Sequence, residues 1–416
     1  MKKLRVGVWL YKDKISPEMG GAYGYYNELI NAINKHSFKD TEIVFLSNEE
    51  ISIKQFNCKK IFWKQKKLTL LNFFLIIAKN ISPSGIGVYK IKESINKEIK
   101  KLRTEVDQYA DVIYYPIPVC IYPDVPYVYT LWDLGHITSY AFPEISMDGN
   151  FEQRKIHHDT IPQKALMIFA ESEAGKKECE QYLRINRNKI NVIPIFSSNV
   201  ISSECKAIKP SQLDENAFFI HYPAQYSAHK NHFNLLEAMP AIVKEFPGIQ
   251  LVLSGSKGNN NYITHTISEL GLEKSVLELD FVSQEELRWL YEHSHGLVFP
   301  SLLGPTNMPL IEAATLGCPV ACTNLSGHIE QLGEYGYYFN GLNSDDIAKQ
   351  IIQMIRDKKN GFSKKYKPNF TIETAIEAID KAFTELRSVR FCWGHDWCGM
   401  ENKKIENYEN TDKNKK

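Results

Sequence analysis

Three features that this sequence lacks exclude whole classes of protein. It has no run approaching the ~20 apolar residues that a membrane-spanning helix needs. Its 50 basic and 49 acidic residues leave a formal net charge of +1, so no overall field attracts the chain to nucleic acid. No G-x-G-x-x-G motif follows the first expected strand, which argues against a nicotinamide-dependent Rossmann enzyme.

Cysteine is too scattered to form a disulfide framework. The chain has eight cysteines, and most of them, such as Cys120, Cys318 and Cys322, stand beside apolar residues, as reduced thiols in a protein core do. Met1-Lys2-Lys3 leads directly into an apolar strand and not into a signal-peptide pattern. Both observations predict a cytoplasmic protein.

No metal or cofactor is expected. Cys392, His395 and Cys398 lie close together, but they lack a fourth ligand and their spacing fits no standard zinc site. Asp345 and Asp346 follow a turn and are typical of the first turn of a helix rather than of a metal centre. The sequence therefore predicts chemistry that relies on side chains and backbone groups.

The chain alternates between short apolar stretches of strand length and helical stretches. This alternation predicts an α/β protein with parallel, doubly wound sheets. Serines, lysines and a proline interrupt the pattern between Ile195 and Leu213, where we place a linker. We expect Rossmann-like domains over residues 1–200 and 201–370, a C-terminal helix over 371–390, and a polar, partly disordered tail over 391–416. The expected strands are 4–10, 42–46, 111–115, 127–129, 167–170, 189–193, 218–222, 250–254, 276–279, 297–299, 320–323 and 337–339.

Residues 298–323 carry the most functional information. Their sequence, VFPSLLGPTNMPLIEAATLGCPVACT, predicts a buried strand, an irregular loop, a short helix over 310–316 and a second strand. Pro309 suits the first helical position and Gly317 the C-terminal cap. A polar loop that enters a helix after a parallel strand offers free N–H groups and the positive end of the helix dipole, which favour phosphate. Glu312, on the first turn, is placed to reach a sugar hydroxyl.

This segment resembles the signature of retaining nucleotide-sugar glycosyltransferases of family 4, roughly P-S-x-x-E-G-F-G-x-P-x-x-E-A-x-x-x-G-x-P-V. The resemblance implies the GT-B architecture, in which two Rossmann-like doubly wound domains face each other across a cleft and the last helix packs back toward the first domain. It implies that Glu312 binds the nucleotide ribose and that Thr306, Asn307 and Met308 contact the donor. Gly304 replaces the family's first glutamate, which contacts the transferred sugar, so the sugar stays open. The matching positions are Pro300, Ser301, Pro309, Glu312, Ala313, Gly317, Pro319 and Val320.

Two further segments of the second half fit the same resemblance. Lys230 and Asn231, in YPAQYSAHKNH, match a motif that holds the donor diphosphate in the family, while Gln225 stands where the family has an arginine. We therefore expect Lys230 to bind the diphosphate and assist its departure. In FVSQEELRWLY, Ser283 begins a helix capping box, and the resemblance places Val282 and Ser283 beside the nucleotide base.

The first half offers residues for both substrates. Gly20 and Gly21 lie between the first strand and the first helix, where a Gly-Gly turn lets the backbone approach a ligand; a plain tight turn is the alternative, and the resemblance favours donor binding. Asp133 and His136, in YTLWDLGHITS, follow a strand and provide a carboxylate and an imidazole for an attacking acceptor hydroxyl. A helix-capping aspartate with an exposed histidine is the alternative. Ser172 either lines the cleft or caps the helix that follows it.

Residues 59–80, KKIFWKQKKLTLLNFFLIIAKN, are basic and then apolar. Two interpretations stay open: a segment that lies on an anionic membrane surface, or a buried core helix with a charged approach. Acceptors in surface-polysaccharide pathways are often lipid-linked, which favours peripheral membrane contact at the inner face of the membrane.

The residues and the resemblance together predict a metal-independent retaining glycosyltransferase that needs no cofactor. The donor would be a nucleoside diphosphate sugar and the acceptor a sugar or a lipid-linked sugar, with surface polysaccharide or glycolipid as the product. The alternative is a catalytically weak GT-B descendant that binds a nucleotide or a sugar, because Gly304 and Gln225 replace two of the family's polar residues.

Overall fold

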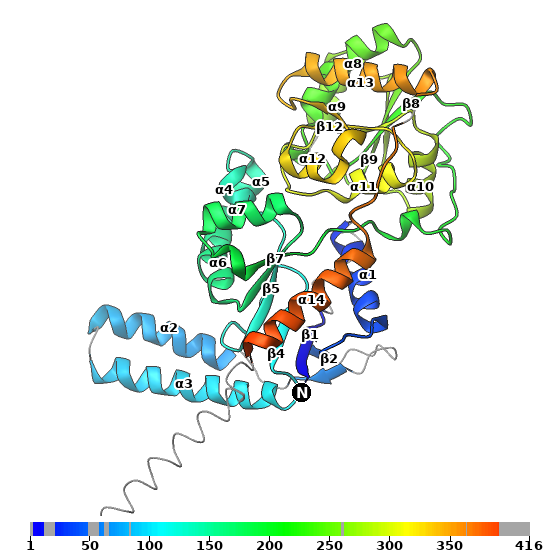
Figure 1. The fold of residues 1–416 in the computed structure, drawn as a ribbon. Helices are drawn as coiled ribbons and strands as arrows, with labels where there is room; N and C mark the ends of the chain where they lie inside the picture. The colour runs from blue at the N-terminus through cyan, green and yellow to red at the C-terminus, as the bar shows by residue number, and fades with distance from the viewer. Residues whose placement is uncertain are drawn as a thin grey trace, which may run out of the picture.

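The computed structural model describes residues 3–11, 21–48, 58–61, 66–82, 85–258, 262–362 and 364–390. Gly20, the cysteine–histidine group at 392–398 and the tail over 391–416 lie outside the described residues. The described chain forms two parallel β-sheets, each flanked by helices, and Figure 1 shows the second sheet above the first. This is the doubly wound α/β fold that the sequence predicts.

The first sheet has seven described strands in the order β3-β2-β1-β4-β5-β6-β7, all of them parallel. Its central strands are continuous apolar runs such as VIYY and YVYTL, and every residue of these two strands is buried. Such runs are typical of parallel sheets, because helices cover both faces. The strands are β1 (Leu4–Trp9), β2 (Thr41–Ser47), β3 (Cys58–Lys60), β4 (Val112–Tyr115), β5 (Tyr127–Leu131), β6 (Met167–Ala170) and β7 (Ile190–Val192).

The second sheet has six described strands in the order β10-β9-β8-β11-β12-β13, again all parallel. In both sheets the strand order reverses beside the first strand, between β1 and β4 and between β8 and β11. Doubly wound sheets bind their ligands outside the carboxyl ends of the strands at such a reversal. The strands are β8 (Phe219–Pro223), β9 (Gln250–Ser254), β10 (Val276–Leu279), β11 (Leu297–Phe299), β12 (Val320–Thr323) and β13 (Tyr337–Phe339).

The helix after β11 begins earlier than the sequence predicts. It spans Met308–Thr315, with Asn307 as its N-cap and Pro309 in its first turn, where a missing N–H costs no hydrogen bond. The helices are α1 (Gly21–Lys35), α2 (Lys66–Ile81), α3 (Ile86–Asp107), α4 (Gly135–Thr138), α5 (Pro143–Ser146), α6 (Asn150–Lys164), α7 (Glu173–Leu183), α8 (His232–Glu245), α9 (Tyr262–Glu269), α10 (Gln284–His293), α11 (Met308–Thr315), α12 (Ser326–Leu332), α13 (Ser344–Lys359) and α14 (Ile372–Arg390).

The last helix, α14, returns from the second sheet and lies along the first one (Figure 1). Phe383, on this helix, is fully buried. Its ring lies 6.0 Å from that of Phe38, 5.8 Å from that of Tyr114 and 5.9 Å from that of Phe169, measured between ring centroids. Residues from both ends of the chain therefore share one core.

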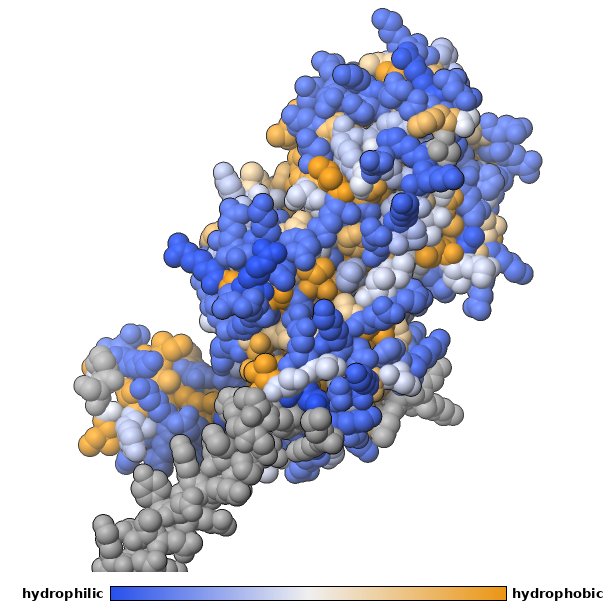
Figure 2. Space-filling view, in the orientation of Figure 1, coloured by the Kyte–Doolittle hydropathy of each residue, from blue (hydrophilic) through white to orange (hydrophobic). Residues whose placement is uncertain are grey.

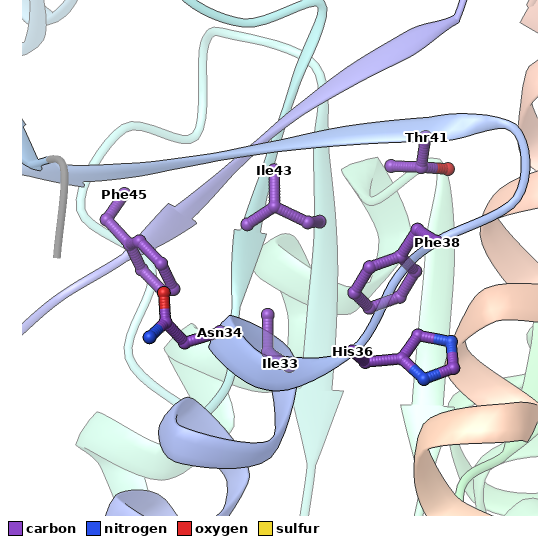
Figure 3. Close-up of a pocket in the computed structure, with 7 residues that line it drawn as sticks. All are labelled: Ile33, Asn34, His36, Phe38, Thr41, Ile43 and Phe45. Atoms are coloured by element: carbon purple, nitrogen blue, oxygen red, sulfur yellow. The ribbon is translucent and has the colours of Figure 1, made fainter. Parts of the chain in front are cut away.

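A cavity of about 150 Å³ lies between the end of α1 and strand β2 (Figure 3). Polar and apolar side chains both line it, and one of them, His36, contacts Asp380 of α14 at 3.3 Å between the ring Nε2 and the carboxylate. Its lining residues Thr41, Ile43 and Phe45 follow one another along β2, so the cavity lies beside this strand and not beyond the carboxyl ends of the strands, where parallel sheets bind ligands. We therefore treat it as a packing gap beneath α14.

Replacement of Phe383 by alanine should show how strongly α14 holds the first domain. We expect Phe383→Ala to lower the free energy of unfolding by about 3–5 kcal/mol, the cost of removing a buried phenylalanine ring. Urea titration followed by tryptophan fluorescence measures this change. Val389, on the same helix, is 69% exposed, so Val389→Ala is the matched control. Equal stabilities of the two variants would contradict a shared core.

Candidate active site

A cavity of about 500 Å³ lies between the two sheets and is lined by residues of both. Trp132 and Asp133 follow β5 and Glu171 follows β6, so the first sheet contributes side chains from the carboxyl ends of its strands. From the second sheet come the loops after β8, β9, β10 and β11, which meet the cavity at the same edge. This is where doubly wound sheets bind ligands.

Some of the predicted site residues meet in this cavity and others do not. Their roles in binding and catalysis stay predictions. The residues that line the cavity are Gly21, Asp133, Lys230, Val282, Thr306, Asn307 and Met308. Those that lie behind its walls are His136, Asn231, Ser283 and Glu312.

The loop from Ser301 to Asn307 carries the cavity wall into the N-terminus of α11. Gly304 has a φ of +109°, and a Cβ there would lie 3.1 Å from the side-chain nitrogen of Asn307. Backbone of this kind strains any residue with a side chain, so the loop geometry suits glycine where the family resemblance places a glutamate. Gln331 holds the loop from outside through two hydrogen bonds of 3.0 Å with the backbone of Asn307.

Lys230 lies at the end of a short 3-10 helix, η4 (Ala228–Lys230), after β8. Desolvation lowers the pKa of its ammonium group to about 8, although Asp133 and Glu144 act in the opposite direction. Its Nζ lies 5.4 Å from the ring centroid of Phe299 and forms no ion pair within the described part of the chain. A cation enclosed in this way is stabilised by an anion that enters the cavity.

Asn231 shapes the cavity without lining it. Its backbone is left-handed, with a φ of 60°, a conformation that asparagine tolerates better than most residues. The side-chain nitrogen donates to the carbonyl oxygens of Pro300 at 3.1 Å and of Gly341 at 2.7 Å. Asn231 thus ties the loop that carries Lys230 to the loop after β11, and a buried amide of this kind fixes the position of the lysine.

Glu312 is 3% exposed and its carboxylate already has three protein donors. The backbone N–H and the hydroxyl of Ser198 donate to it at 3.1 and 2.6 Å, and the hydroxyl of Tyr291 donates at 3.0 Å. Burial raises its pKa, while these hydrogen bonds favour the ionised form. In the structure Glu312 therefore anchors the connection between the two sheets, and ribose binding would require exchange of these partners.

Asp133 and His136 are not equivalent in the structure. The carboxylate of Asp133 lines the cavity, accepts a hydrogen bond of 2.7 Å from the N–H of Gly135 and pairs with Arg154. His136 is 1% exposed in α4, and its ring centroid lies 4.7 Å from that of His158. Burial lowers the pKa of His136 to about 4, so the imidazole is neutral near pH 7. It is neither the exposed residue nor the cavity-lining residue that the sequence suggests.

Several hydrogen bonds cross the cleft and hold its two walls together. The hydroxyl of Thr306 donates to the carboxyl group of Glu171 at 2.5 Å. The N–H of His229 donates to Glu144 at 2.9 Å. Glu330 of α12 accepts from the first N–H groups of α7, where an acidic side chain also complements the helix dipole. Each contact joins a residue of one sheet's loops to a residue of the other's.

The capping predictions for α7 and α10 are correct. The hydroxyl of Ser172 accepts from the N–H of Gly175 at 3.0 Å and is fully buried, which favours the cap over the cleft. Ser283 and Glu286 form the expected capping box. The structure also places Trp132, Arg154 and Glu171 at or beside the cleft; sequence reasoning missed Arg154, because an arginine in a helix with no apolar period gives no signal.

Residues 204–370 match the family model of glycosyl transferases group 1. O-antigen chain mannosyltransferase B of Escherichia coli is 28% identical over 141 residues, which cover 33% of this chain and 36% of the relative. The capsular polysaccharide biosynthesis glycosyltransferase CapM of Staphylococcus aureus is 27% identical over 201 residues, 46% of this chain and 52% of the relative. The chain thus spans about a third to a half of these relatives.

Solved structures match over much more of the chain. A glycosyltransferase from Rickettsia africae superimposes with a TM-score of 0.58 at 14% identity and covers 92% of this chain and 99% of its own. Anabaena HepE, in complex with UDP-glucose, superimposes with a TM-score of 0.58 at 16% identity and covers 93% of this chain and 100% of its own. The chain therefore has the GT-B fold that the sequence predicts, and its residues 204–370 resemble the glycosyl transferases of group 1.

Proposed function

We propose that this protein transfers a sugar from a nucleoside diphosphate sugar to an acceptor hydroxyl with retention, in surface-polysaccharide or glycolipid biosynthesis. The observation that carries the proposal is that Lys230 and the first residues of α11 line the same cavity between the two sheets. Relatives named for O-antigen and capsular polysaccharide synthesis support the pathway, and a structural neighbour in complex with UDP-glucose supports the donor class.

The diphosphate would lie between Lys230 and the first turn of α11. Lys230 provides a positive charge without an ionic partner in the described chain, and the helix N-terminus adds unpaired N–H groups and a positive dipole end. These groups stabilise negative charge that grows on the diphosphate as the bond to the sugar breaks. This arrangement meets the diphosphate charge with protein groups, so we propose that transfer needs no metal ion and no cofactor.

The acceptor would approach from the wall formed by the first sheet. Asp133 is held there by Gly135 and Arg154, so its carboxylate is oriented to accept a hydrogen bond from an attacking hydroxyl. His136 lies behind this wall, and we assign it a positioning role through the packing of α4. Retention and attack on the face that the diphosphate leaves follow from the family resemblance.

A non-catalytic binding module is the second candidate. Gln225 lines the cavity at the position where the family has a phosphate-binding arginine, and Gly304 occupies the position of the first glutamate. Both replacements remove a charged group from the donor site. The two candidates differ in turnover, because a binding module would hold the donor without consuming it.

Donor consumption tests the proposed function directly. We expect one of a panel of UDP- and GDP-sugars to release its nucleoside diphosphate when extracts of bacterial glycolipids are added as acceptors. The rate should be unchanged by EDTA, since Lys230 and the α11 N-terminus meet the phosphate charge. A coupled assay for free UDP or GDP measures it. Tight binding without release would favour the binding module, and full, reversible loss in EDTA would contradict metal independence.

Substitutions of Lys230 test the phosphate site. We expect Lys230→Ala to lower the transfer rate about 10²-fold or more, because a charged donor to the leaving group is lost. Lys244→Ala, at an exposed lysine of α8, is the control. The pKa of Lys230 is lowered to about 8, so the charged form disappears as pH rises through 8. Affinity for UDP or GDP should therefore fall between pH 7 and pH 9.

Lys230→Arg separates this titration from others in the cleft. Arginine stays protonated throughout this range, so calorimetric affinity should change much less with pH in the variant than in the wild type. Any dependence of affinity on pH that remains in the variant comes from other groups of the cleft. Glu171, with a pKa raised to about 8, is a group that titrates in this range. The assignment is wrong if the wild-type affinity is constant from pH 7 to pH 9.

We further propose that α2 and α3 bring the enzyme to a lipid surface. None of the described helices is long and apolar enough to cross a bilayer. The hairpin of α2 and α3 projects from the first sheet in Figure 1, and Figure 2 shows apolar residues gathered on it. Its exposed apolar side chains are Leu70, Phe73, Phe74, Ile76, Ile77, Ile81, Ile86 and Tyr89.

Charge and exposure both favour an anionic lipid surface as the occupant. Residues 66–107, which span the hairpin, contain nine basic and four acidic residues, and each basic residue near an anionic surface contributes attraction. Ile81 is 80% exposed and Ile86 is 77% exposed, so the most exposed apolar side chains lie at the turn of the hairpin. Exposure of Phe73 and Ile76 on α2 argues against the core-helix interpretation of residues 59–80.

Vesicle binding distinguishes a lipid surface from a second copy of the chain. The double variant Phe73→Ser, Ile76→Ser should reduce co-sedimentation with vesicles of phosphatidylglycerol and phosphatidylcholine at least 10-fold, because burial of two such side chains is lost. Phe362 is 57% exposed outside the hairpin, so Phe362→Ser is the control. If light scattering shows that the wild type is a dimer and the wild type does not bind vesicles, the apolar face of the hairpin binds a second copy of the chain and not a lipid surface.

A further inference from the structure

The wall of the cleft that belongs to the first sheet contains two carboxyl groups, those of Asp133 and Glu171. Asp133 is already engaged by the N–H of Gly135 and by Arg154. Glu171 follows β6 directly and is 7% exposed. Its Oε2 accepts the hydroxyl of Thr306, and no described residue donates to its Oε1. Glu171 thus presents to the cavity a carboxyl group whose Oε1 accepts no hydrogen bond from a described residue.

The partner of Glu171 places it close to the proposed diphosphate site. Thr306 lies two residues before the first residue of α11, whose N-terminus we assign to the diphosphate. A sugar attached to that diphosphate would therefore lie near the contact between Thr306 and Glu171. The opposite wall cannot supply a carboxylate there, because residues 301–309, SLLGPTNMP, contain no charged side chain.

We propose that Glu171 binds a hydroxyl group of the sugar of the donor, a proposal that rests on the function proposed above. A buried carboxyl group accepts strong hydrogen bonds from sugar hydroxyls, and Oε1 is the atom available for them. Thr306 fixes the side chain through Oε2, so the carboxyl group is oriented before the donor binds. The first domain would in this way select the sugar, while the second domain binds the nucleotide and the diphosphate.

The electrostatics of the site are consistent with this role. Burial raises the pKa of Glu171 to about 8, with a further increase from Asp133, while the hydrogen bond from Thr306 acts in the opposite direction. Near neutral pH the carboxyl group of the free protein is therefore largely protonated. A sugar hydroxyl that donates to Oε1 favours the ionised form of the carboxyl group.

Calorimetry with and without the sugar tests the proposal. Wild-type protein is titrated with UDP, UDP-glucose, GDP and GDP-mannose to find the pair that binds. Glu171→Gln keeps the size of the side chain and a carbonyl acceptor for Thr306. We expect it to weaken binding of the nucleotide sugar at least 10-fold and to change binding of the matching nucleoside diphosphate less than 2-fold. Glu171→Asp, which shortens the reach, should show the same selective loss.

Two results would overturn the proposal. Unchanged affinity of Glu171→Gln for the nucleotide sugar would remove Glu171 from the sugar site. Equal losses for the nucleotide sugar and the nucleoside diphosphate, with a lowered melting temperature that Thr306→Val reproduces, would make Glu171 a structural link between the domains. Failure of the wild type to bind any of the four nucleotides would instead contradict the proposed function, so the two failures are distinguishable.

Discussion

A half-buried lysine that has no ionic partner in the described chain is the feature on which the rest of this cleft depends. Lys230 is surrounded closely enough that desolvation lowers its pKa to about 8, and the described chain offers it no carboxylate at ion-pair distance. The loop that carries it is fixed by Asn231, which is tied to the loop after β11. A cation that is held in place without an ionic partner is ready to bind an anionic ligand. Folding has already desolvated the ammonium group, and the anion offsets that free-energy cost.

The two sheets depend on each other to complete this site. Neither sheet alone encloses the cavity, and the contacts that join them run through side chains next to the cavity, as in the hydrogen bonds from Thr306 to Glu171 and from His229 to Glu144. Because these bonds link one wall to the other, the relative position of the sheets is sensitive to the groups that line the cleft. A ligand that contacts both walls would stabilise the same arrangement.

Twelve of the thirteen described strands were predictable from sequence, because burial on both faces leaves a strong pattern. The exception is β3 (Cys58–Lys60), whose sequence CKK has no such apolar pattern. Runs such as VIYY and MIFA have the length of a strand and contain no polar side chain except the tyrosine hydroxyls. The loop between β11 and α11 was predictable for a local reason as well, since Pro309 and Gly317 mark the ends of a helix that follows a strand closely. The expectation of the GT-B fold itself came from the resemblance, and the two parallel sheets and the superposition on solved glycosyltransferases confirm it.

Local sequence determined the strands, the caps of α7 and α10 and the loop that enters α11, because each depends on residues within a few positions of one another. The tertiary structure decided which of the predicted polar residues reach the cavity. It buried His136 against His158 and gave Glu312 internal partners from Ser198 and Tyr291. It also brought Glu171 to Thr306, residues 135 positions apart in the chain. Contacts of this kind depend on how two sheets pack, and no periodicity or spacing along the chain encodes them.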